Sequence, residues 1–136
     1  MLLDTPPALA EFRTLLLAGP CAGERVATSF PKDAPDRLVR IERIGGRPES
    51  TITDAPRMLV HVYDTDGIAA EQRANRILDY LEHGGWSHTR TESGHLLRGW
   101  RTETVMPLLD PDRPHLHRWQ VMGAFRLSRL TSRQTS

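Results

Sequence analysis

The chain has 136 residues, a length that fits one domain with one hydrophobic core. Hydrophobic residues make up 38% and charged residues 26%, which is the balance of a soluble globular protein and excludes a disordered chain. The formal net charge of +1 gives no general attraction to nucleic acid or to an anionic membrane.

The sequence contains one cysteine, Cys21, which excludes an internal disulfide and any zinc site built from several cysteines. Its start lacks the basic residues and long apolar run of a signal peptide, and no stretch reaches the ~20 apolar residues needed to cross a bilayer. We therefore expect a protein that is made in the cytoplasm and has no membrane partner.

The first predicted element is a helix that begins near Thr5-Pro6-Pro7, with a Thr or Asp cap, and ends at Gly19-Pro20. Its apolar residues fall on one stripe, which we interpret as ordinary core: Leu9, Phe12, Leu15 and Leu16. A short strand is then expected over residues 23–30, followed by a proline-containing turn.

Residues 37–83 form the centre of the chain and predict a strand, a loop, a second strand and a helix. Residues 37–44 make the first strand, with charged side chains along it. Gly45-Gly46 then permits the positive φ of a tight turn or a bulge. Residues 47–55 are polar and predict a mobile loop.

The second half of this central unit is more apolar. Residues 58–63 are apolar on both faces apart from His61, which predicts a central strand covered on both sides and a hydrogen-bonded core histidine. Residues 66–83 predict an amphipathic helix capped by Asp64 or Asp66.

The remaining sequence is rich in strand patterns. Residues 86–92 and 95–104 predict a hairpin that turns at Ser93-Gly94. The last strand is predicted over residues 116–130, with a bend at Gly123. Its core face carries Trp119, Val121, Phe125 and Leu127.

Together these elements predict one α+β domain over residues 1–130. We expect a mixed, mainly antiparallel sheet of about four to six strands, packed by two helices. Residues 131–136 predict a polar, disordered C-terminal tail.

The sequence lacks the local motifs of the common enzyme classes, because no nucleophile elbow, P-loop or dinucleotide-binding glycine motif is present. Gly45-Gly46 is not followed directly by a helix and therefore cannot cradle a phosphate. Cys21 follows a helix end, where nothing lowers the pKa of its thiol. We therefore expect no enzyme activity, no catalytic residue and no cofactor.

His115 and His117 are the only closely spaced histidines, and on a strand they would share a face that can suit a metal. No third ligand follows at a helical or hairpin spacing, so two surface histidines beside a proline loop are the favoured interpretation. We expect no metal site, and a metal-dependent enzyme is the last alternative that we keep.

Arginines gather in the centre of the chain and again beside two tryptophans nearer the C-terminus, a combination that can bind single-stranded nucleic acid. Acidic residues are interspersed among them, which favours a solvated surface or a protein interface. The residues concerned are Arg37, Arg40, Arg43, Arg47, Arg57, Arg98, Arg101 and Arg118, with Trp100 and Trp119.

The order helix, strands, helix, strands resembles the tail terminator proteins of long-tailed phages, in particular those of actinobacterial phages and prophages. The resemblance covers roughly residues 5–130 and depends on the order and spacing of several segments. These are Arg43–Gly46, Asp54–Arg57, Met58–Tyr63, the helix around Ala69, Ala70 and Ala74, the turn region Pro107–Pro114, and Arg118-Trp119-Gln120.

The resemblance implies a structural virion protein that forms a hexameric ring at the head-proximal end of the tail tube. Such a ring stops tube polymerisation and offers a docking surface to the head connector. The implied partners are the major tail tube protein, the head-completion or stopper protein and further copies of the same chain, with DNA only passing through the lumen. The implied location is the tail neck of the virion, and no cofactor is implied.

Interfaces of this kind favour arginine and aromatic anchors. Our candidate interface residues are Arg40, Arg43, Gly45, Gly46, Arg57, Trp100 and Trp119. Ordinary packing or solvation is the alternative for each of them. Another head-completion or neck connector protein is the alternative function, and a small nucleic-acid-binding module, with salt-dependent affinity for DNA, is the alternative from a different class.

Overall fold

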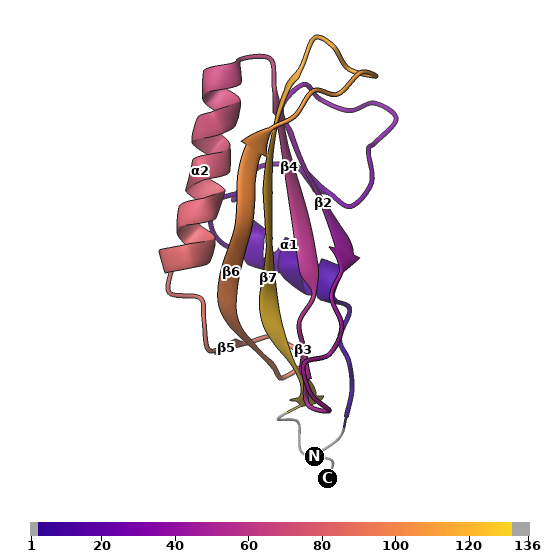
Figure 1. Cartoon of the computed structure of the whole chain (residues 1–136), viewed down its shortest axis with the longest axis vertical. Helices are drawn as coiled ribbons and strands as arrows, with labels where there is room; N and C mark the ends of the chain where they lie inside the picture. Colours follow the sequence, from indigo (N-terminus) through magenta and orange to yellow (C-terminus); the bar gives the residue numbers. More distant parts are fainter. Residues whose placement is uncertain (1–2, 132–136) are drawn as a thin grey trace.

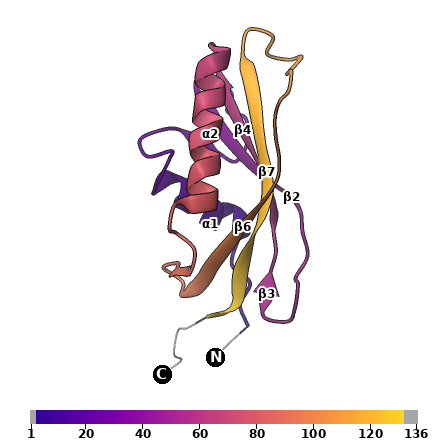
Figure 2. The same ribbon diagram turned by 60° about the vertical axis from the view of Figure 1, so that its left-hand side comes forward.

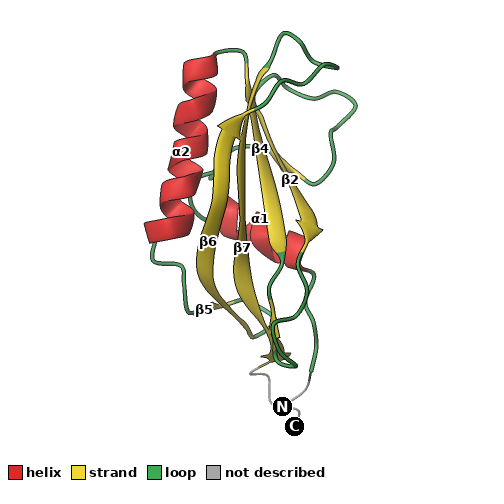
Figure 3. Cartoon of the chain, in the orientation of Figure 1, coloured by secondary structure: helices red, strands yellow, loops and turns green. Residues whose placement is uncertain are grey.

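The computed structural model describes residues 3–131, which form two helices and seven strands (Figures 1 and 3). The helices are α1 (Ala8–Leu17) and α2 (Gly67–His83). The strands are β1 (Val26–Ala27), β2 (Leu38–Gly45), β3 (Thr53–Asp54), β4 (Arg57–Asp64), β5 (Thr89–Arg90), β6 (His95–Pro107) and β7 (His117–Thr131). Of the predicted C-terminal tail, Thr131 ends β7 and the remaining residues lie outside the described part of the chain.

All seven strands belong to one curved sheet with the order β1-β2-β4-β7-β6-β5, and β3 pairs with the far end of β7 (Figure 1). β1 runs parallel to β2, and the other pairings are antiparallel. The structure confirms the prediction of an α+β fold with a mixed, mainly antiparallel sheet and two helices. Three strands of only two residues bring the number of strands to seven.

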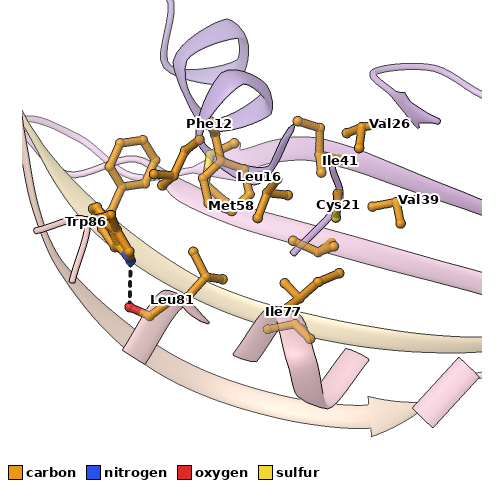
Figure 4. Packing of buried hydrophobic residues seen from close by; sticks show 14 of the residues in the cluster. Phe12, Leu16, Cys21, Val26, Val39, Ile41, Met58, Ile77, Leu81 and Trp86 are labelled. Atoms are coloured by element: carbon orange, nitrogen blue, oxygen red, sulfur yellow. Dashed lines mark hydrogen bonds between the residues drawn. The ribbon is translucent and has the colours of Figure 1, made fainter. Parts of the chain in front are cut away.

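Both helices pack on the same face of the sheet, and the main hydrophobic core lies between them and the strands (Figure 2). Figure 4 shows the side chains that meet there, among them Phe12 and Leu16 from α1 and Ile77 and Leu81 from α2. Each fully buried side chain of this size stabilises the fold by about 1.5–3 kcal/mol. The predicted apolar stripes of both helices are therefore confirmed as core.

The helix starts differ from each other in how they are capped. Asp66 caps α2 as predicted, because its carboxylate accepts a hydrogen bond from the backbone N–H of Ile68 at 3.0 Å. The predicted start of α1 is wrong, because the helix begins at Ala8 with Pro7 in the cap position and no side-chain cap. The hydroxyl of Thr5 instead accepts a hydrogen bond from Arg129 on β7, and so Thr5 belongs to the sheet edge.

The predicted hairpin is only partly present, because Thr89–Arg90 is the only strand within residues 86–92, although the N–H groups of His88 and Thr91 on either side of it also donate to carbonyls of β6. Trp86 precedes this strand and is buried in the core. Its indole N–H donates to the carbonyl oxygen of Leu81 (Figure 4) and to that of Tyr80, each at 3.0 Å. The carbonyl of Tyr80 also accepts from the N–H of Gly84 at 2.8 Å, and both carbonyls belong to the last turn, so the tryptophan closes the end of α2. The predicted strand over residues 23–30 is likewise reduced to β1.

The second face of the sheet carries a smaller hydrophobic cluster at one end. There Leu38, Tyr63 and Leu116 form a small cluster that is joined by Phe30 from the loop before β2. β4 is buried along both faces, as the sequence predicts for a central strand. The part of this face that lies beyond the small cluster carries the polar groove described next.

Candidate functional site

A groove of about 590 Å³ lies at the sheet face that the helices do not cover. Its floor comes from the beginning of β4 and from neighbouring parts of β6 and β7, and its wall is the segment between β2 and β3, which stands away from the sheet (Figure 2). Side chains alternate between faces along a strand, so Arg57 points into the groove while its neighbour Met58 is buried in the main core. The charged lining residues are Arg47, Glu49, Arg57, Arg101, Glu103 and Arg126.

An ion pair between Arg57 and Glu103 forms the floor of the groove. Arg57 on β4 donates from Nε and Nη2 to the two carboxylate oxygens of Glu103 on β6, both at 2.9 Å. β7 lies between these two strands, and Ala124 of β7 is opposite Arg57. The ion pair therefore crosses over β7. The hydrogen bond to Glu103 raises the pKa of Arg57, and the same bond lowers the pKa of Glu103. Both side chains are charged at neutral pH, and the two hydrogen bonds fix the orientation of each side chain relative to the other.

The wall of the groove is held in place by Arg43. Its guanidinium donates to both carboxylate oxygens of Asp54 at 3.3 Å, and to the carbonyl oxygens of Gly45 at 3.0 Å and Gly46 at 2.9 Å. Gly46 has a φ of +83° and lies so close to the carbonyl oxygen of Ala55 that a Cβ would clash. The predicted glycine turn is therefore present, and its conformation is fixed from two sides.

The groove has an excess of positive charge. Arg126 donates from Nε to the two carboxylate oxygens of Glu49 at 3.1 and 3.0 Å, and the other glutamate is already paired with Arg57. The side chains of Arg47 and Arg101 have no hydrogen bond or ion pair to any residue within 3–131, although the charge of Arg101 helps to lower the pKa of Glu103. Two of the four arginines that line the groove are thus available to an anionic partner.

The structure brings three of the seven predicted interface residues to this groove: Gly46, Arg57 and Trp100. Arg43 and Gly45 lie directly behind it, in the contacts that fix the wall. Arg40 and Trp119 lie elsewhere. Arg40 pairs with Glu42 at 3.6 Å on the uncovered face, and Trp119 packs on the helix side of the sheet.

Both candidate tryptophans take part in core packing. The ring of Trp100 stacks on Phe12 with 5.8 Å between centroids, and its N–H donates to the hydroxyl of Thr102 at 2.8 Å. A Cβ on Gly123 would clash with this ring, so Gly123 allows close packing against Trp100. Gly123 pairs with Thr102, and one of the register irregularities of β6 follows there, between Thr102 and Thr104. Ordinary packing thus describes the observed contacts of Trp100.

Of the six charged lining residues, sequence reasoning selected only Arg57 as an interface candidate. Arg47 and Arg101 were named among the clustered arginines but not selected, and Glu49, Glu103 and Arg126 were missed. Arg101 and Glu103 carry a local signal, because they alternate with Trp100 and Thr102 and must therefore lie on the other face of β6. Glu49 carries no such signal, since its partner Arg126 is 77 positions later in the chain.

The histidines and the cysteine behave as structural or surface groups. His61 is buried, and its ring nitrogens lie 2.9 Å from Glu42 and 3.3 Å from Gln120, which confirms the predicted hydrogen-bonded core histidine. His115 lies in the loop before β7 and pairs with Asp36 at 3.5 Å. Within residues 3–131, no three His, Cys, Asp or Glu side chains are grouped as ligands for a metal ion. Burial raises the pKa of Cys21 to about 12.

Comparisons with known proteins found no protein-family model and no curated protein that matches this sequence. Neither α1 nor α2, the helices that residues 3–131 form, is long and apolar enough to cross a membrane.

Proposed function

We propose that this chain is a tail terminator: a ring-forming virion protein that caps the head-proximal end of a phage tail tube and presents a docking surface to the head connector. The observation that carries the proposal is the distribution of exposed apolar side chains, which gather at the two opposite ends of an elongated subunit. A capping ring needs contacts at both of its faces, with the tube on one side and the connector on the other.

The first end is formed by the β6–β7 loop and the first turn of α2 (Figure 1). Leu109 is 88% exposed and Ile68 is 69% exposed, and Met106 and Leu108 are exposed beside them. The two elements lie together, because Gly67 at the start of α2 packs against the ring of His117 at the start of β7. Apolar side chains gathered in this way are typical of a surface that binds another protein.

The second end is formed by the N-terminal segment and the segment before β3 (Figure 1). Leu3 and Ile52 are exposed there. Both segments are hydrogen-bonded to the same residue of β7, because the N–H of Asp4 donates to the Arg129 carbonyl and the N–H of Arg129 donates to the Ile52 carbonyl. These exposed side chains are therefore attached to the rigid sheet, which favours a preformed docking surface.

Electron microscopy of tail tubes tests the proposal. Tubes are assembled from the tube protein that the proposal expects to be encoded beside this chain, with and without the chain, and their lengths and ends are compared. A terminator gives shorter tubes that carry a ring at one end. Tubes that grow to the same length and stay undecorated contradict the proposal.

Two variants separate the two ends. Leu108→Ser/Leu109→Ser removes the apolar tip of the β6–β7 loop, and Ile52→Ser removes the exposed side chain at the other end. We expect one variant to lose tube capping and the other to cap tubes but fail to join them to heads. The matched control is Ala22→Ser, an exposed position between α1 and β1, which should leave both steps unchanged.

The same experiment distinguishes the alternative neck protein. A head-completion connector binds heads or portal rings and leaves bare tubes undecorated. A result of that kind would favour the connector over the terminator. The two apolar ends do not distinguish these proteins, because either one would need contacts at both ends.

A further inference from the structure

We propose that the arginine-lined groove is the docking site for helix α2 of a second copy of this chain, so that subunits associate head to tail. The inference deepens the proposed function and rests on it for the closed ring, but the contact between two copies can be measured without tubes or heads.

The groove sets a charge requirement for its occupant. The guanidinium groups of Arg47 on its wall and Arg101 on its floor make no hydrogen bond or ion pair among the described residues, whereas the two glutamates of the groove are each held by another arginine. Glu103, the nearest acid to Arg101, is already bound through both carboxylate oxygens by Arg57. An occupant that supplies two carboxylates would pair with both free guanidinium groups and leave the existing ion pairs intact.

The exposed face of α2 meets this requirement. It carries Glu71, Asp79 and Glu82 against one arginine, Arg76. The carboxylates of Glu71 and Asp79 have no hydrogen bond or ion pair to any residue within 3–131. They are eight positions apart, so they lie on one side of the helix, separated by about 12 Å along its axis. The helix face thus has two negative charges in excess, which matches the excess of two positive charges in the groove.

The placement of the two surfaces determines the symmetry of the contact. α2 lies on the face of the sheet opposite to the groove (Figure 2). A contact between α2 of one copy and the groove of the next therefore uses two different surfaces of the same chain. Contacts of this heterologous kind propagate in one direction and close into rings when the rotation permits, whereas a two-fold dimer would leave one surface unused.

Cross-linking between two introduced cysteines tests the contact directly. Asn75→Cys lies on the exposed face of α2 and Ala124→Cys lines the groove, and neither substitution removes a charge. The native Cys21 is buried and does not compete for a short bis-maleimide reagent. The double variant should give a ladder of dimers, trimers and larger species, both alone at high concentration and on tubes. Asp33→Cys combined with Ala124→Cys is the matched control and should give no ladder.

Charge reversal then tests the pairing. Arg47→Glu/Arg101→Glu reverses the groove, and Glu71→Arg/Asp79→Arg reverses the helix, each in the cross-linking background. We expect either reversal to lower the cross-linked fraction by about tenfold or more, because like charges then face each other. The chain with all four reversals should regain the ladder. All four positions are exposed, and circular dichroism of each variant checks that the fold is retained.

Three outcomes would overturn the inference. The first is a double-cysteine chain that cross-links no more than the Asp33 control, both alone and on tubes. The second is a loss of the ladder in both reversals that the fourfold variant does not restore. The third is loss of tube capping in the groove reversal but not in the helix reversal, which would assign the groove to an acidic segment of another protein. Uncapped tubes with an intact ladder would instead count against the proposed function alone.

Discussion

Arg43 and Asp54 form the contact that holds the wall of the groove. Asp54 is 2% exposed, and both of its carboxylate oxygens accept hydrogen bonds from the same guanidinium group at 3.3 Å. Two further donors of Arg43 are used by the carbonyl oxygens of Gly45 and Gly46. The side chain that the sequence suggested as an interface anchor is therefore engaged by its own chain.

We predict that Arg43→Ala lowers the free energy of unfolding by about 2 kcal/mol, because Asp54 is left as a buried carboxylate without its charged partner. Urea denaturation measures this change. The matched control is Arg47→Ala, four positions later and unpaired within the described residues, which should change the stability by less than ~0.5 kcal/mol. Equal stabilities for the two variants would contradict the assignment of Arg43 to the wall.

Two glycines with positive φ allow the stability cost of the backbone conformation to be measured separately from the cost of a close contact. Gly23 has a φ of +76° and open space around it, whereas Gly46 has a φ of +83° and packs against the backbone at Ala55. We expect Gly23→Ala to cost about 1 kcal/mol of stability and Gly46→Ala about 3 kcal/mol. Thermal or urea unfolding of the two variants measures the difference, and similar losses at both positions would rule out the close approach at Gly46.

Substitution of Trp100 tests whether this side chain stabilises the isolated subunit or serves only in an interface. Trp100→Ala removes the ring that stacks on Phe12, and should cost about 3 kcal/mol in the isolated subunit. Leu109→Ala, at a fully exposed position, should leave subunit stability nearly unchanged. If Trp100→Ala unfolds at the same urea concentration as the native chain, the ring is not a core group.

The pH dependence of stability should contain a contribution from His61. Burial lowers the pKa of this histidine below its ordinary value of 6.5, against the smaller raising effect of the hydrogen bond to Glu42, and Arg40 and Arg118 lower the pKa further. The unfolded chain therefore takes up a proton first as the pH falls. Stability from this group is complete above pH 6.5 and is lost as the pH falls through the lowered value.

His61→Gln removes this titration, and so the slope of unfolding free energy against pH between about 7 and 5 should be smaller in the variant. Urea denaturation at a series of pH values measures the slope. An unchanged or steeper slope in the variant would show that His61 is not the group responsible.

Local sequence patterns predict those helices and strands that have one apolar face and one polar face. The alternation in β7 places Trp119, Val121 and Phe125 on the core side, and the helical repeat in α2 places Ala74 and Ile77 there, as the structure confirms. Residues 86–92 mislead, because Trp86 reads as a strand residue but is buried beneath the end of α2.

The candidate groove could not be predicted, because it joins segments that are distant in sequence. Arg57 and Glu103 are 46 positions apart and lie on strands that are not neighbours, with β7 between them. The sequence around neither residue indicates which residue it pairs with. Only the strand order of the sheet, which follows from long-range pairing, brings the two together.

The central claim is that the chain caps a tail tube, and the most direct test is the length and end structure of tubes assembled with and without it. We expect tubes formed with the native chain to be shorter and to carry a ring at one end only. Leu108→Ser/Leu109→Ser or Ile52→Ser should abolish that ring, according to which end contacts the tube. Tubes of equal length with bare ends in the presence of the folded native chain would contradict the account.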